Sequence, residues 1–214
     1  MTHNPQWTEI IWELLPGWVA LDHPNLVAWV FQMKKNALLH NIYTKGIFGW
    51  VVVYIYTIEF QKHGLPHCHL LIFLAQESWM LTPEDINSAI SAQWPDPNTQ
   101  PKLFDTLKWC MVHSPCSTMN QLAWCMDKGQ CTKHFPKPFT DCTTLDDNSY
   151  PWYHCPDNGR SYQVGPHAVS NQWIVLYNPY LSAKYDCHIN LESVVSFATI
   201  KYVFKYIHTG NTKI

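Results

Sequence analysis

The chain has few charged side chains, and arginine is almost missing. Charged residues make up 14% of the 214 residues, the formal net charge at pH 7 is -2, and Arg160 is the only arginine. Proteins that hold nucleic acid through a dense basic surface need many more lysines and arginines. The composition argues against that class of protein, but it still allows an enzyme that contacts nucleic acid at one site.

Long apolar runs are missing as well. No stretch of about 20 uncharged apolar residues occurs, so we expect no transmembrane helix and no membrane partner. The N-terminus does not have the basic-then-apolar pattern of a signal peptide. The eight cysteines are then expected in a reducing compartment, where metal-ligand or core roles are more common than disulfides.

The residues that are present predict an α+β domain. Its core is expected to be substantial, since 47% of the residues are hydrophobic. Apolar spacing, β-branched runs and capping residues predict helices and strands in alternation. The expected helices span 22–42, a segment from Thr82, 103–112 and 190–208, and the expected strands span 47–61, 67–74 and 173–177. We expect one domain over 1–214, with an irregular cysteine-rich insertion at 113–165.

Two histidines on the second strand are the first candidate site. Side chains alternate along a strand, so His67 and His69 share one face while Cys68 points to the other. If the hairpin turns around Gly64, Gln61 lies opposite His67 and Glu59 lies opposite His69. Two imidazoles with a carboxylate suit Mg²⁺, Mn²⁺ or Zn²⁺, and Glu59 and Gln61 remain alternatives for the third ligand.

Two tyrosines near the end of the expected last helix are the second candidate. Tyr202 and Tyr206 are four residues apart and therefore share one helix face. Taken alone, they are ordinary packing residues. With a metal polarising a phosphate they become candidate nucleophiles, and Lys201 or Lys205 could contact the phosphate and stabilise its charge.

The insertion holds a third candidate, a group of soft metal ligands. Its pattern is His113-x2-Cys116-x8-Cys125-x5-Cys131-x2-His134. We prefer His113, Cys116, Cys125 and Cys131 as a tetrahedral structural Zn²⁺ site, with His134 as a substitute. The alternative is that these are free, buried cysteines.

Several of these motifs occur together in the order found in one family. They are Tyr56 to His69 (YTIEFQKHGLPHCH), Phe135 to Phe139 (FPKPF), Tyr177 to Tyr180 (YNPY), Cys187 to Asn190 (CHIN) and Lys201 to Tyr206 (KYVFKY). With Asn4-Pro5-x-Trp7, they make the chain resemble the helicase-like N-terminal domain, or Rep nuclease domain, of Helitron transposases. This family belongs to the His-hydrophobe-His endonucleases.

The resemblance implies a central antiparallel sheet flanked by helices and a nuclease dependent on Mg²⁺ or Mn²⁺. The implied substrate is single-stranded DNA, nicked through a 5′-phosphotyrosine link and then transferred. Mapped onto this sequence, His67 and His69 are the metal pair, Tyr202 and Tyr206 are the nucleophiles, and Glu59 is the usual third ligand. A nuclear location is implied by the same resemblance.

The sequence also departs from the family pattern. The family's first strand ends in Thr-Cys-Asn-Pro-x-Trp, whereas this chain starts within that motif and has His3 in place of the cysteine. No Gly-x-x-x-x-Gly-Lys-Ser/Thr loop occurs, so the helicase that is normally fused to this domain is not expected here. A catalytically inactive, transposon-derived remnant that binds DNA, or one that binds metal structurally, is the alternative function.

Overall fold

The computed structural model describes residues 1–61, 64–146 and 150–193. This part of the chain falls into two compact units. Within the described ranges, unit 1 comprises residues of Met1–Met80 and Lys184–Ile189, and unit 2 comprises residues of Leu81–Ala183 and Asn190–Ser193. Helices and small antiparallel two-stranded sheets occur together, which confirms the predicted α+β class.

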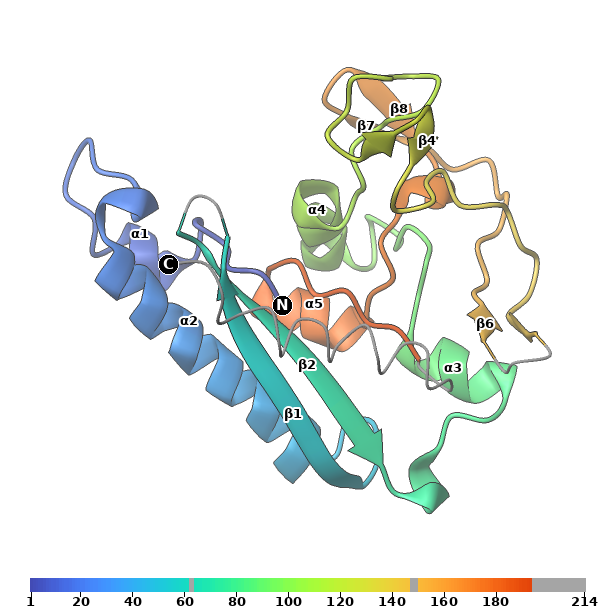
Figure 1. Ribbon diagram of the computed structural model, residues 1–214, viewed down its shortest axis with the longest axis horizontal. Coiled ribbons are helices and arrows are strands. Elements are labelled where there is room, and N and C mark those ends of the chain that lie inside the picture. Colours follow the sequence, from blue (N-terminus) through green and yellow to red (C-terminus); the bar gives the residue numbers. More distant parts are fainter. Residues whose placement is uncertain (62–63, 147–149, 194–214) are drawn as a thin grey trace. The chain divides into compact units, whose positions relative to one another are not determined.

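Unit 1 is built on one long helix and one hairpin. Helix α2 (Pro24–Leu39) begins with proline at its first position, where the missing N–H removes no helical hydrogen bond. Its buried side chains recur at helical spacing, as in Val27, Val30 and Phe31. Figure 1 shows α2 lying along the hairpin of β1 (Val51–Phe60) and β2 (Pro66–Leu74). The hairpin and α2 therefore form the frame that carries the histidine pair.

The hairpin register differs from the predicted one by two residues. Glu59 pairs with His67, and Thr57 pairs with His69. Gln61 lies beyond the end of β1, where its backbone N–H donates to the carbonyl oxygen of Leu65 at 3.0 Å. The prediction that Gln61 lies opposite His67 is thus wrong, because Gln61 belongs to the turn. A shift of two residues preserves the face of each side chain, so Glu59 stays on the histidine side.

The N-terminal residues lie along the other edge of β2. Thr2 forms an antiparallel bridge with His67. The N–H of Cys68 donates to the carbonyl oxygen of Met1 at 2.8 Å, and the N–H of His3 donates to that of Pro66 at 3.2 Å. Three residues of the chain thus pair with β2 as a short strand segment.

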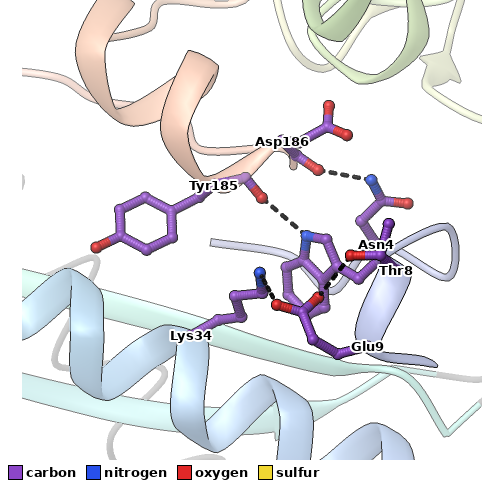
Figure 2. A network of polar contacts seen from close by, with 7 residues as sticks. Asn4, Thr8, Glu9, Lys34, Tyr185 and Asp186 are labelled. Carbon is purple, nitrogen blue, oxygen red and sulfur yellow. Dashed lines mark hydrogen bonds and ion pairs between the residues drawn. The ribbon is translucent and has the colours of Figure 1, made fainter. Parts of the chain in front are cut away.

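Residues 1–3 are followed by α1 (Thr8–Ile11), and a polar network holds this part of the chain in unit 1 (Figure 2). The side-chain amide of Asn4 donates to the backbone oxygen of Asp186 at 2.6 Å. Lys34 and Glu9 form an ion pair with 2.6 Å between Nζ and Oε1. These contacts join the segment before α1 to residues 184–189, and α1 to α2, within the same unit.

Unit 2 has its own core of large apolar side chains and cysteines. Trp94, Leu107, Met111 and Ile174 are fully or almost fully buried in it, together with Cys116, Cys125 and Cys131. Thr82 caps α3 (Pro83–Ala89) as predicted, since its hydroxyl accepts the N–H of Asp85 at 3.2 Å. The remaining elements are α4 (Pro101–Cys110), β3 (Met126–Asp127), β4 (Gln130–Cys131), β5 (Thr144–Leu145), β6 (Pro151–Trp152), β7 (Tyr162–Val164), β8 (His167–Val169) and α5 (Pro179–Tyr185).

One predicted element of the last third is wrong, the strand at 173–177, and most of another, the helix expected at 190–208, lies outside the described residues. No strand spans 173–177, because only single bridges form there, between Ile174 and Val112 and between Tyr177 and Ser91. Residues 190–193 are not helical, and the side chain of Asn190 bonds Glu192 instead of capping a helix. None of the helices in the described ranges is both long and apolar enough to span a membrane.

Candidate metal centres

The first centre is the face of the β1–β2 hairpin that carries His67 and His69. Their ring centroids lie 4.5 Å apart, at an interplanar angle of 63°. Cys68, between them, points to the opposite face and is 2% exposed. The alternation predicted from the sequence therefore holds, and two imidazoles share one rigid strand face.

The N-terminal segment contacts the ring of His67. Its Nδ1 atom lies 2.7 Å from the hydroxyl oxygen of Thr2. Burial lowers the pKa of His67 to about 3. His67 is therefore a neutral imidazole at neutral pH, which is the form that binds metal ions.

His69 is paired with an acid from the neighbouring strand. Its Nε2 atom lies 3.4 Å from a carboxylate oxygen of Glu59, across the diagonal of the hairpin. The side chain of His69 is 25% exposed and that of Glu59 is 53% exposed, so the pair is open to solvent. Two imidazoles and one carboxylate fit a divalent ion such as Mn²⁺ or Zn²⁺ by the chemistry of their donor atoms.

The second centre is the cysteine-rich group of unit 2. One ligand atom from each of His113, Cys116, Cys125 and Cys131 lies within 4.8 Å of all the others, and all four residues are buried. Among the residues that the structure describes, this is the group that brings three or more such atoms so close. The ligand atoms of His67, His69 and Glu59 do not all lie within this distance of one another. His134, the substitute considered from the sequence, is not part of the group.

Short local structures bring these four residues together. The β3–β4 hairpin turns through Lys128 and Gly129, which both have positive φ, at 48° and 79°. A two-residue turn of this kind matches the twist of the strands, and it places Cys125 near Cys131. The N–H of Lys133 donates to the Cys131 sulfur at 3.4 Å. The Nε2 atom of His113 lies 3.6 Å from the sulfur of Cys116 and 3.5 Å from that of Cys131.

The electrostatics of this group favour a cation. Burial raises the pKa of the Cys125 thiol to about 11, and the neighbouring thiols Cys116 and Cys131 add to this. Burial also acts to raise the pKa of Cys131, but the backbone N–H groups of Phe135 and Lys133 outweigh it and lower the pKa. If all three were ionised, the thiolates would repel one another without a counter-charge. The group could hold a metal ion, and a divalent cation would remove this repulsion.

No sequence pattern connects the aromatic residues around this group with it. The ring of Phe135 stacks on that of His113, with centroids 4.2 Å apart and an interplanar angle of 9°. Trp173 lies parallel to His113 at 6.4 Å. Burial lowers the pKa of His113, and the positive charges of Lys137 and Lys133 contribute to the same effect. His113 is thus fixed in orientation and favoured in its neutral form. At the hairpin, no sequence pattern connects Thr2 with His67.

The tyrosine site lies outside the described residues. Tyr202, Tyr206, Lys201 and Lys205 all fall within 194–214, for which the structure gives no placement. Their predicted roles as nucleophiles and phosphate contacts stay predictions.

The comparisons with known proteins place the hairpin in a family context. No curated protein matches the chain. Residues 1–72 match the sequence model of a family described as "Helitron helicase-like domain at N-terminus". The match includes α1, α2, β1 and the histidine pair of β2. The resemblance to the Helitron helicase-like N-terminal domain is therefore confirmed over residues 1–72 of this chain.

Proposed function

We propose that this protein is a metal-dependent endonuclease of the Helitron Rep type, which nicks and transfers single-stranded DNA. One observation carries the proposal. Within the segment that matches the family, His67 and His69 share a strand face, and Glu59 lies 3.4 Å from His69. A rigid pair of imidazoles beside a carboxylate is a suitable half-site for a divalent ion.

The residues of the hairpin would hold and orient the ion. His67 and His69 supply nitrogen ligands from β2, and Glu59 supplies an oxygen ligand from β1. A bound Mg²⁺ or Mn²⁺ would polarise the phosphate of the DNA and stabilise negative charge in the transition state. The open face at Glu59 and His69 leaves room for a substrate oxygen.

The nucleophile is assigned from the resemblance. Tyr202 or Tyr206 would attack the phosphorus, so that a 5′-phosphotyrosine bond forms, the 3′ oxygen leaves, and that oxygen takes up a proton. The second tyrosine would permit strand transfer within one site. Lys201 and Lys205 are proposed as phosphate contacts. A nuclear location is proposed from the same resemblance, because the substrate would be DNA.

A labelled single-stranded oligonucleotide with Mn²⁺ tests the proposal. We expect a covalent protein–DNA band on a denaturing gel, and we expect it to disappear in His67→Ala and His69→Ala. A mobility shift in a native gel without any covalent band would contradict the nuclease and support a DNA-binding remnant. No shift and no band would leave a metal-binding structural protein as the function.

We also propose that His113, Cys116, Cys125 and Cys131 hold a structural Zn²⁺ in unit 2. All four are buried and close together, and three thiols with one imidazole are a usual tetrahedral donor set for zinc. The surrounding elements β3 and β4 have two residues each, too few to be stable without a tether. Zinc would supply that tether and fix the local core.

A further inference from the structure

The hydroxyl of Thr2 lies 2.7 Å from the Nδ1 atom of His67. The backbone of the N-terminal segment fixes this hydroxyl in place. The N–H of Thr2 donates to the carbonyl oxygen of His188 at 2.8 Å. On the two sides of Thr2, Met1 and His3 are bonded to Cys68 and Pro66 of β2. Thr2 is thus clamped between two segments of unit 1.

The contact matters because a neutral imidazole has one N–H and one lone pair. When Nδ1 carries the hydrogen, Nε2 has the free lone pair and can bind a metal ion. When Nε2 carries the hydrogen, the same atom cannot act as a ligand. The partner of Nδ1 therefore decides whether Nε2 of His67 is ready to bind.

We propose that Thr2 is a positioning residue for the hairpin metal site, because its hydroxyl accepts the Nδ1–H of His67 and leaves Nε2 free as the ligand. The inference rests on the proposed function, since it assumes that His67 binds the ion. Thr2 itself contacts neither the metal nor the substrate.

The two histidines of the pair are oriented in different ways. His67 has a hydroxyl behind it, whereas the Nε2 atom of His69 faces the carboxylate of Glu59 at 3.4 Å. Removal of the hydroxyl should affect His67 alone. It should free the ring to rotate and allow the Nε2–H tautomer, which lowers the affinity of the site.

Two variants of Thr2 separate the hydroxyl from the shape of the side chain. Thr2→Val keeps the β-branched shape and removes the hydroxyl, whereas Thr2→Ser keeps the hydroxyl. Loss of a hydrogen-bond partner behind a metal ligand typically costs about 10- to 100-fold in metal affinity. We expect Thr2→Val to weaken Mn²⁺ binding by about 10-fold or more, and Thr2→Ser to bind within about threefold of the wild type. Thr44→Val, at an exposed threonine of the same unit, is the matched control and should bind like the wild type.

The tautomer can be read without any metal. In the full chain labelled with ¹⁵N at histidine, long-range proton–nitrogen spectra at pH 7.5 distinguish a protonated from an unprotonated ring nitrogen. We expect His67, assigned by its loss in His67→Ala, to carry its hydrogen on Nδ1 in the wild type and to populate the other tautomer in Thr2→Val. A wild-type His67 with its hydrogen on Nε2 would overturn the inference, and so would unchanged Mn²⁺ affinity in Thr2→Val.

The two proposals fail in different ways. If His67→Ala binds Mn²⁺ as tightly as the wild type, the metal site itself is wrong, and the positioning role is overturned with it. If His67→Ala loses Mn²⁺ but Thr2→Val does not, the metal site stands and only the role of Thr2 is overturned. Far-ultraviolet circular dichroism of each variant checks that the fold is retained. If Thr2→Val does not fold, the tautomer of His67 in the wild type still decides the inference.

Discussion

The indole Nε1–H of Trp7 donates a 2.8 Å hydrogen bond to the backbone carbonyl oxygen of Tyr185, which lies 178 residues further along the chain. Both residues are 3% exposed. The side-chain amide of Asn41 also bonds the hydroxyl of the same Tyr185. One buried tyrosine thus joins the start of the chain, and the short helical segment His40–Thr44 that follows α2, to the segment 184–189 of unit 1.

We predict that Trp7→Phe lowers the free energy of unfolding by about 1–3 kcal/mol, because it leaves a buried carbonyl oxygen without its partner. Urea unfolding followed by circular dichroism measures this. Trp12→Phe is the matched control, since Trp12 is 81% exposed, and it should change stability by less than about 0.5 kcal/mol. Equal effects of the two substitutions would show that the buried bond contributes nothing.

The hairpin register makes a prediction about the third ligand. Glu59 pairs with His67 and faces His69, whereas Gln61 lies in the turn. We expect Glu59→Ala to lower Mn²⁺ affinity by at least about 10-fold, and Gln61→Ala to leave it unchanged. Isothermal titration with Mn²⁺ measures both. A larger loss in Gln61→Ala would mean that the turn rearranges to bring Gln61 to the ion.

Face and spacing could be predicted at this hairpin, but register could not. Alternation along β2 correctly put His67 and His69 on one side and buried Cys68 on the other. Register depends on the length of the turn, and the residues between Phe60 and Pro66 gave no fixed turn type. An error of two residues left Glu59 on the correct face and changed only its direct partner.

At the cysteine-rich group, too, the ligands could be predicted from the sequence, but the contacts around them could not. Spacing alone suggested His113, Cys116, Cys125 and Cys131, and the structure brings these four together. The stacking of Phe135 on His113, and the bond from Thr2 to His67, depend on tertiary contacts over 22 and 65 residues. No local pattern encodes such contacts. The wrong strand at 173–177 has the same cause, because Ile174 and Tyr177 form single bridges to separate segments.

The free energy of unfolding should decrease at acid pH because of His3. Its two ring nitrogens are buried and have no hydrogen-bond partner in the described part of the chain, and burial lowers its pKa from 6.5 to about 4. The unfolded chain therefore binds more protons between pH 6.5 and 4, so stability decreases as the pH falls through this range. His67, with its pKa lowered to about 3, acts in the same direction.

We expect His3→Phe to be less sensitive to acid than the wild type, because phenylalanine can pack against Trp7 as His3 does and does not titrate. Urea unfolding at pH 7.5 and pH 5 measures the difference. The two proteins should be similar at pH 7.5, where His3 is neutral in both states, and the variant should be the more stable one at pH 5. The same loss of stability in both proteins would show that His3 contributes nothing to the acid response.

The last prediction concerns the proposed zinc of unit 2. The protein purified without chelators should contain about one zinc per chain, bound by the four buried ligands. We expect the double variant Cys116→Ser and Cys125→Ser to lose it, because a serine hydroxyl does not replace a thiolate on Zn²⁺. Elemental analysis measures the metal content. Cys142→Ser is the matched control, since Cys142 is an exposed free cysteine outside the group, and it should keep its zinc.

Loss of the zinc should also lower the stability of unit 2. Without the ion, the cysteines are buried thiols, and the pKa of Cys125 is raised to about 11. The neighbouring hairpin has strands of only two residues each. Thermal unfolding of the wild type should therefore shift to lower temperature when a strong chelator is added, whereas that of the double variant should not respond. Zinc retained in the double variant, or a wild type without zinc, would contradict the site.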